Sequence, residues 1–244
     1  MMIPDGDRRR ESPETETVPI LANGHEVDAL WFRSRLIDWG RDHFRSFPWR
    51  VTNDPYRLLM AEVMLHRTQV RQVLPVYKRF MELFPDIAAL ARATRESIHD
   101  VMGPLGLHWR IDLVADMAAD IVGRFGARVP SDRDELLSLP GVSDYIASAV
   151  RCFSFGLDDP LVDTNTVRIV GRVFGLPVKP SSRRNKRFRE LLDGLLDRES
   201  PAAYNYSLLD LAHLICLSRR APECGRCPLL ASCATGAARV AVAT

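Results

Sequence analysis

The segment 139-LPGVSDYIASAV-150 joins two apolar runs through a tight turn and carries Tyr145 shortly after the turn. Gly141 frees the turn, because glycine adopts left-handed backbone angles without steric cost, and Ser143 can cap a following helix. In such a hairpin, backbone N–H groups and the positive end of the second helix point towards one spot, where a phosphate can bind without any base being recognised. By itself the pattern also fits an ordinary Pro-Gly turn between helices, so the choice depends on the rest of the chain.

Helical periodicity extends from this hairpin in both directions. Apolar residues recur at helical spacing over residues 27–44 and 56–84, with Asp54 positioned to cap the second stretch and Pro75 expected to break it. Further helices are expected at about 86–92, 94–103, 110–126, 131–138, 144–156, 162–175, 184–198 and 201–215. No convincing alternating strand pattern is present. The sequence therefore predicts an all-α protein of short helices joined by tight turns.

Length and composition limit the class of protein. The chain has 244 residues, of which 46% are hydrophobic, enough to bury one large core or two modest ones. No apolar run approaches the roughly 20 residues that span a bilayer. The N-terminal stretch MMIPDGDRRRESPETET lacks the apolar core of a secretion signal, and its mixed polar composition predicts a disordered tail over residues 1–25. We therefore expect a cytoplasmic protein without a membrane partner.

The charged residues give a weaker indication. The net charge is only +2, so the chain is no polycation. Only three of the 33 basic residues are lysines: Lys78, Lys179 and Lys186. Arginine favours bidentate contacts with phosphates and bases, but a GC-rich genome also raises the arginine content. Composition alone therefore does not predict a nucleic-acid partner.

Four of the five cysteines lie close together in 216-CLSRRAPECGRCPLLASC-233, with seven, two and five residues between successive cysteines. In a cytoplasmic chain such a compact group is more often a metal site than a pair of disulfides. Four thiolates suit either Zn²⁺ or an iron–sulfur cluster, and the spacing leaves both open. The fifth, Cys152, lies in an apolar helical pattern and is interpreted as a packing residue.

Together these motifs resemble the helix-hairpin-helix DNA glycosylases of the endonuclease III and MutY superfamily. The resemblance rests on five segments in the family's order over about residues 30–233: DPYRLLMAEVMLHRTQV, LPGVSDY, 161-LVDTNTVRIVGRVFG-175, YNYSLLDLAHLIC and the cysteine loop. It implies a two-lobed, all-α glycosylase core over residues 26–233. Residues from about 50 to 160 would form a six-helix lobe with the hairpin, and the N-terminal helix and residues 161–233 a second lobe. Residues 234–244 are left as a C-terminal tail.

The resemblance also implies cofactors. The family's cysteine loop holds a [4Fe–4S] cluster, whose ligands here would be Cys216, Cys224, Cys227 and Cys233. The family usually has six residues between its first two cysteines, whereas this chain has seven, and one more residue costs a surface loop little. The resemblance further admits a monovalent cation at the hairpin.

A pair of carboxyl groups is implied as the catalytic machinery. Cleavage of an N-glycosidic bond passes through an oxocarbenium-like state, which a fixed carboxylate can stabilise. Asp163 occupies the position of the family's essential aspartate. Glu62 matches the glutamate with which MutY-like enzymes protonate or orient the departing base, and burial among its apolar neighbours would raise its pKa. A helix cap for Asp163 and a solvated helix face for Glu62 are the alternative structural interpretations.

Tyr145 occupies the position that separates the branches of this superfamily. Bifunctional relatives such as endonuclease III carry a lysine there, whose amine forms a Schiff base with the sugar. MutY-type adenine glycosylases typically have serine, and the mismatch-specific thymine glycosylases have tyrosine. A phenol forms no imine. The resemblance therefore predicts hydrolytic removal of thymine or uracil mispaired with guanine, which leaves an abasic site; a tyrosine of the core is the alternative.

Contacts with double-stranded DNA follow from the same resemblance. His66 and Arg67 would occupy the turn that enters the duplex, with Arg67 filling the vacated stack or facing the opposite base. Phosphate contacts are expected from Leu139, Gly141 and Ser143 in the hairpin and from Arg219, Arg220 and Arg226 in the cysteine loop. The run 181-SSRRNKRFR-189 is interpreted as a solvated helix face. We expect a monomer, associated with the nucleoid, that binds duplexes with a mismatched or damaged base.

Three other functions stay open. An adenine glycosylase acting opposite 8-oxoguanine fits the pair Glu62 and Asp163, but not Tyr145, nor the short stretch after Cys233, where MutY proteins usually carry a further domain. A bifunctional lyase for oxidised pyrimidines lacks its lysine. A non-catalytic DNA-binding or protein-binding module would leave the presence of both carboxyl groups unexplained.

Overall fold

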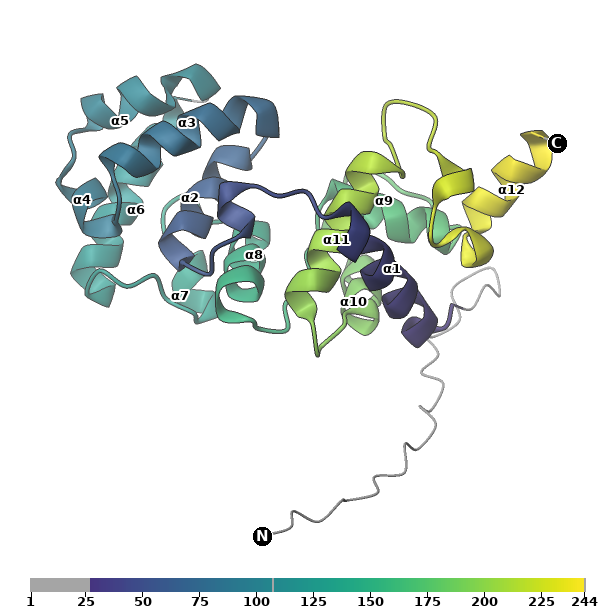
Figure 1. Ribbon diagram of the computed structural model, residues 1–244. Helices are drawn as coiled ribbons and strands as arrows, with labels where there is room; N and C mark the ends of the chain where they lie inside the picture. Colours follow the sequence, from purple (N-terminus) through teal and green to yellow (C-terminus); the bar gives the residue numbers. More distant parts are fainter. Residues whose placement is uncertain (1–26, 107, 244) are drawn as a thin grey trace, which may run out of the picture.

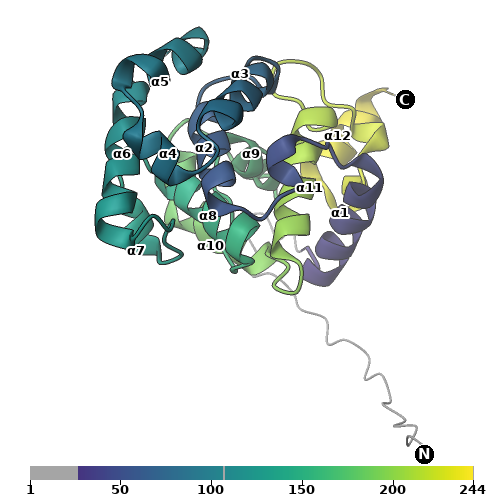
Figure 2. The same ribbon diagram turned by 60° about the vertical axis from the view of Figure 1, so that its left-hand side comes forward.

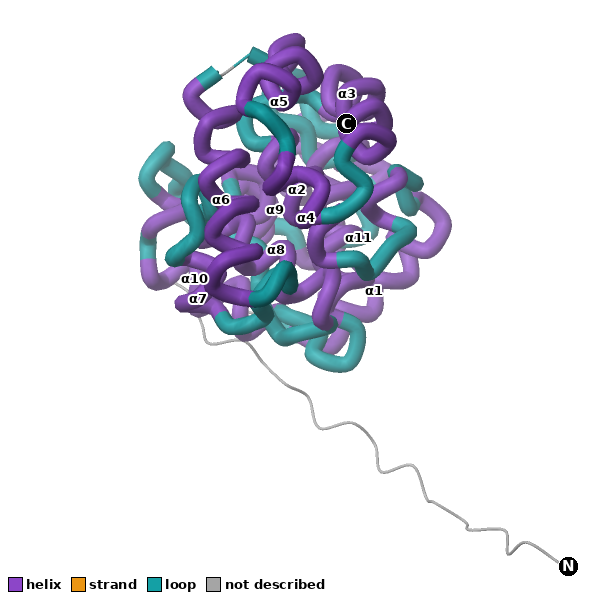
Figure 3. The backbone as a smooth tube through the Cα atoms, turned by 90° about the vertical axis from the view of Figure 1, so that its left-hand side faces the viewer, coloured by secondary structure: helices purple, strands orange, loops and turns teal. Residues whose placement is uncertain are grey.

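The protein is built from helices throughout the part of the chain that the computed structural model describes, residues 27–106 and 108–243 (Figures 1 and 3). Within these residues there is no β-strand, which confirms the all-α prediction. The predicted disordered tail over residues 1–25 lies outside the described residues. None of the described helices is long and apolar enough to span a bilayer.

The helices are arranged in two lobes, each with its own buried apolar cluster (Figure 1). The first lobe contains α2 (Pro55–Leu65), α3 (Val70–Leu83), α4 (Ile87–Arg92), α5 (Arg95–Met102), α6 (Trp109–Phe125), α7 (Arg133–Leu137) and α8 (Asp144–Phe155). The second contains α1 (Ala29–His43), α9 (Thr164–Val173), α10 (Lys186–Leu195), α11 (Pro201–Leu214) and α12 (Ala234–Ala243). Since α1 packs against α11, the first lobe is one continuous insertion between the parts of the second (Figure 2).

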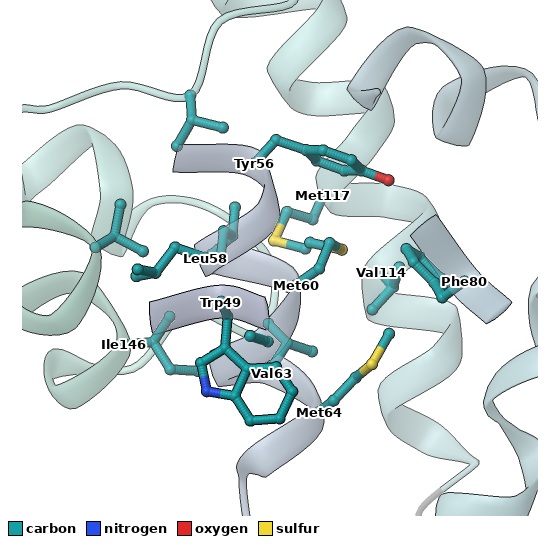
Figure 4. Packing of buried hydrophobic residues seen from close by; sticks show 14 of the residues in the cluster. Trp49, Tyr56, Leu58, Met60, Val63, Met64, Phe80, Val114, Met117 and Ile146 are labelled. Carbon is teal, nitrogen blue, oxygen red and sulfur yellow. The ribbon is translucent and has the colours of Figure 1, made fainter. Parts of the chain in front are cut away.

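Helix α2 runs through the centre of the first lobe and is buried on every side (Figure 4). It begins where the Asp54 carboxylate accepts hydrogen bonds from the N–H groups of Tyr56 and Arg57, with Pro55 in the first turn. Its side chains from Leu58 to Met64 are all buried. A helical stretch that is buried all round belongs in a core, so Glu62, the one charged residue between Leu58 and Met64, is taken into the core as well.

The expected break at Pro75 is wrong: the long helical stretch is interrupted at residues 66–69 instead, and Pro75 lies inside α3. A proline inside a helix removes one hydrogen bond. Here the buried stripe of Val73, Val76, Tyr77 and Phe80 continues past it, so packing holds the helix together. The interruption contains Arg67, whose φ of 63° is left-handed; a residue in that conformation does not continue a right-handed helix.

Two further features bear on the second lobe. The stretch left as a C-terminal tail forms α12, which begins directly after Cys233 and packs against α9. Helices α1 and α11 approach closely at Gly40, where an added Cβ would lie 1.9 Å from the Ser207 hydroxyl. Only glycine fits there, and this contact fixes the N-terminal helix on the lobe that carries the cysteine loop.

Candidate active site at the junction of the two lobes

Asp163 is the N-cap of α9. One carboxylate oxygen, Oδ1, accepts hydrogen bonds from the N–H groups of Asn165 and Thr166, both at 2.8 Å, and the Thr166 hydroxyl accepts one from the Asp163 N–H in return. The second oxygen, Oδ2, accepts from the Asn165 side-chain amide at 2.7 Å. The capping interpretation of Asp163 is thus confirmed. It holds the carboxylate in one orientation at the positive end of a helix, which suits a negative charge.

A chain of hydrogen bonds leads from Asp163 to the cysteine loop. The Asn165 side-chain oxygen accepts from Nη1 of Arg168 at 3.0 Å. Nε and Nη2 of Arg168 donate to the carbonyl oxygens of Cys216 and Ala212, at 2.9 and 3.0 Å. The orientation of Asp163 therefore depends on where α11 ends and the cysteine loop begins, a link that no local sequence pattern indicates.

Glu62 is 6% exposed, which excludes a solvated helix face. Burial raises its pKa to about 7; the positive charge of Arg50 opposes this effect and the negative charge of Asp163 adds to it. At neutral pH the carboxyl is therefore about half protonated and can act as a proton donor.

Tyr145 is the second residue of α8 and packs, partly buried, against the core of the first lobe. Burial raises its pKa, and the negative charges of Glu62 and Asp163 raise it further. The phenol is neutral at physiological pH. Three elements, α2, α8 and α9, thus bring the three residues proposed from the sequence into mutual electrostatic contact where the lobes meet.

Arg50 and Tyr206 were not singled out from the sequence. The Arg50 side chain is 7% exposed and binds the carboxylate of Asp210 from Nη1, at 2.8 and 2.9 Å. Its guanidinium lies over the ring of Tyr206, 4.6 Å from the centroid. Tyr206 in turn stacks on Phe153, with ring centroids 3.8 Å apart and planes 1° from parallel. The charge of Arg50 acts on Glu62 and Tyr145, so this group borders the site.

Several positive groups lie on or near the loop between α2 and α3. His66 and Arg67 are both exposed. Arg110 is buried and donates from Nη1 to the carbonyl oxygens of Val63 and Met64, while its Nε and Nη2 have no partner among the described residues. Burial lowers the pKa of His66, and three positive charges lower it further: Arg110, Arg67 and Arg183. In the described chain no carboxylate pairs with these arginines. Arg183 is exposed, as predicted for its segment, and its charge reaches His66 from the second lobe.

The hairpin has the geometry expected of Gly141 and Ser143. Gly141 has a left-handed φ of 78°, and the Ser143 hydroxyl caps α8 by accepting from the Ile146 N–H at 3.3 Å. Both residues are exposed. Leu139 differs, because it is buried and its N–H already donates to the Leu136 carbonyl oxygen at 3.1 Å. It supports the turn and has no free amide for a phosphate.

The four clustered cysteines line one cavity between α9, α11 and α12. Arg172 donates from Nη1 to the Cys216 sulfur at 3.2 Å, and the Gly236 N–H donates to the Cys233 sulfur at 3.3 Å. Among the described residues, no three His, Cys, Asp or Glu side chains are grouped closely enough to hold one metal ion. Four thiols around one cavity, with N–H donors to two sulfurs, are a donor set that fits a larger cluster in which each thiolate binds its own iron. Arg219, Arg220 and Arg226 are exposed on this loop, and Arg226 pairs with Glu223.

The fold has two helical lobes, a glycine-containing hairpin before α8 and two carboxyl groups at the lobe junction. This combination is typical of the helix-hairpin-helix DNA repair proteins. Residues 60–193 match the family described as HhH-GPD superfamily base excision DNA repair protein, and the chain belongs to this family. It is similar to a thymine/uracil-DNA glycosylase of Pyrobaculum aerophilum, with 39% identity over 210 residues, 83% of this chain and 90% of that protein. An adenine DNA glycosylase of Mycolicibacterium smegmatis is 34% identical over 80% of this chain and 66% of its own length. The fold matches the structure of a thermostable thymine-DNA glycosylase with a TM-score of 0.78 and 29% identity, over 86% of this chain and 97% of that one.

Proposed function

We propose that the protein is a monofunctional DNA glycosylase that hydrolyses the N-glycosidic bond of thymine or uracil mispaired with guanine and leaves an abasic site. The observation that carries this proposal is the meeting of Asp163, Glu62 and Tyr145 at the lobe junction. The similarity to thymine/uracil-DNA glycosylases, at higher identity than to the adenine glycosylase, supports the same substrate class.

The two carboxyl groups take different roles because their surroundings differ. Asp163, fixed by three N–H donors, stabilises the positive charge that develops on the sugar and orients the attacking water. Glu62, about half protonated at neutral pH and increasingly so below it, delivers a proton to the departing base. The Tyr145 phenol packs against the extruded nucleotide and, unlike an amine, forms no covalent bond with the sugar.

Duplex DNA is bound through two exposed segments, the hairpin and the α2–α3 loop. The amides of Gly141 and Ser143 and the N-terminus of α8 hold a phosphate. A monovalent cation at the hairpin carbonyl groups would strengthen that contact. Arg67, with His66 beside it, enters the vacated stack, since a mispaired base costs less to extrude than a paired one. Arg219, Arg220 and Arg226 add phosphate contacts, and the protein acts as a monomer on the nucleoid.

We also propose a [4Fe–4S] cluster held by Cys216, Cys224, Cys227 and Cys233. Burial raises the pKa of Cys227 to about 12 and that of Cys233 as well, so these thiols become ligands only where bound cations offset the cost. The cluster would fix the loop that anchors Arg168. Iron analysis and the broad absorbance of the purified protein near ~400 nm test it; zinc in place of iron would contradict it.

The decisive experiment offers the purified protein duplexes with T·G, U·G, A·8-oxoguanine and thymine glycol, each analysed with and without alkali. Excision of T and U opposite G, with strand breaks only after alkali, is the expected result. Excision confined to A·8-oxoguanine would assign the adenine activity instead. Strand cleavage without alkali, trapped by borohydride, would reveal a lyase, and binding without any excision a non-catalytic module.

A further inference from the structure

The group around Arg50 is held more firmly than a surface arginine. Arg50 ends the short 3₁₀ turn η1 (Pro48–Arg50) that directly precedes α2, the helix of Glu62. Its carboxylate partner, Asp210 on α11, is 1% exposed, so the ion pair bridges the two lobes within the protein. The rings of Tyr206, Phe44 and Phe47 lie around the guanidinium at 4.6, 5.7 and 5.4 Å. This packing fixes the plane of the guanidinium before any substrate binds.

The residues that the structure describes use only one edge of the guanidinium. Every hydrogen bond that Arg50 donates, to both oxygens of Asp210 and to the Arg45 carbonyl oxygen at 3.2 Å, comes from Nη1. Nε and Nη2 have no acceptor within the described residues, although the side chain is only 7% exposed. Neither atom is among the fully buried polar atoms of the described residues that lack a partner, so both keep access to solvent and to a ligand. Such an edge is expected where a ligand supplies the acceptor.

The chemistry at the site produces an acceptor of the right charge. When the C1′–N1 bond breaks, its electron pair remains on the pyrimidine, where it is delocalised over N1, O2 and O4. Water supplies a hydroxyl group to C1′, and the proton released from that water restores the neutral base, with Glu62 as the carrier. Arg50 is the largest opposing charge felt by Glu62, and it also acts on Tyr145, so it lies near the two residues that we propose to contact the departing base.

We propose that Arg50 is a catalytic residue for leaving-group departure: its Nε and Nη2 donate to the O2–N1 edge of the departing pyrimidine and stabilise the negative charge that develops there. Tyr206, stacked on Phe153, is a positioning residue that keeps the guanidinium in plane. This inference rests on the proposed excision of thymine or uracil. It identifies the group that stabilises the pyrimidine anion, which is a poor leaving group.

The test compares bases that differ in leaving ability but little in size. Single-turnover excision is measured on duplexes with uracil, 5-fluorouracil or thymine opposite guanine, for wild type and Arg50→Lys. Lysine retains a positive charge for Asp210 but lacks the planar second edge. We expect a loss of about 100-fold on uracil and thymine but about tenfold or less on 5-fluorouracil, whose anion is more stable and needs less help. Equal losses on all three bases, or no loss, would overturn the role.

Arg45→Lys is the matched control, since Arg45 approaches the same Asp210 carboxylate at 3.8 Å from a more exposed position. Its rates should stay within about threefold of wild type on every base. If Arg50→Lys fails to fold, as judged by circular dichroism, Tyr206→Leu keeps both charges and should still give a larger loss on uracil than on 5-fluorouracil; equal losses there refute the inference. A wild type that excises none of the three bases refutes the proposed function, and this inference with it.

Discussion

Glu62 allows the sharpest test of the site, because one buried carboxyl group governs the pH dependence of both stability and activity. Burial raises its pKa from the ordinary 4.5 to about 7. That difference corresponds to a preference of about 3 kcal/mol for the neutral form in the folded protein. The substitution Glu62→Gln keeps the shape of the neutral side chain and cannot ionise, so it removes the preference without leaving a cavity.

The stabilities of wild type and Glu62→Gln are expected to diverge in one direction as the pH rises. Well below pH 4.5 the carboxyl is neutral in the folded and the unfolded chain, so the free energies of unfolding are similar. Between pH 4.5 and about 7 the unfolded chain releases this proton while the folded protein keeps it. The wild type therefore loses up to about 3 kcal/mol relative to the variant. Urea denaturation at several pH values measures the gap, and a gap that does not change with pH would refute the effect of burial.

The same proton should appear in the kinetics. If neutral Glu62 protonates the departing base, single-turnover excision by wild type falls about tenfold per pH unit above pH 7. Glu62→Gln should be slower by about 10²–10³-fold at pH 6.5 and should lose that decline. Glu82→Gln, whose side chain is 67% exposed on α3, is the control and should retain both the rate and the profile. An alkaline decline that persists in Glu62→Gln would assign it to another group.

Further predictions concern single positions around the site. Asp163→Asn should abolish excision while duplex binding, measured by gel shift, persists; turnover above about 1% of wild type would contradict the assignment. Tyr145→Lys should gain a product trapped by borohydride, because an amine beside Asp163 can form the imine that the phenol cannot; no trapped product would mean that residue 145 does not reach the sugar. Arg183→Ala should lower the slope of log affinity against log salt by about one, whereas the exposed Arg187→Ala on α10 should not; equal slopes would remove Arg183 from the DNA interface.

Much of the fold could be predicted from local patterns. The start of α8 at Asp144 and of α2 at Pro55 follow from Ser143 and Asp54, whose side chains cap these helices. The break at residues 66–69 could not be predicted, because proline carries the obvious signal and the left-handed Arg67 carries none. Tertiary packing along the buried face of α3 outweighs the hydrogen bond lost at Pro75.

The site was predictable only in part, for a related reason. Glu62, Asp163 and Tyr145 belong to sequence motifs, so a resemblance can find them, whereas Arg50 is held in place by Asp210, 160 positions away. Neither the arginine of 48-PWR-50 nor the aspartate of YNYSLLD has a local reason to be buried. An arginine between tryptophan and a capped helix, and an acidic residue within an apolar helix, were the available signals. Each of these two signals predicts a buried ion pair only when the arginine and the aspartate are known to be neighbours in the fold.

The different roles that we propose for the two carboxyl groups follow from the elements that hold them. Asp163 stands at a helix N-terminus, where three N–H donors and the helix dipole stabilise a negative charge, so it is suited to the cationic sugar. Glu62 lies in the middle of a buried helix, where the charge that opposes the effect of burial, Arg50, is already bound to Asp210 and offsets the burial only partly. Exchanging their surroundings would exchange their roles. The junction of the lobes therefore determines the chemistry, because α2 provides burial, α9 provides a dipole, and neither lobe alone contains both.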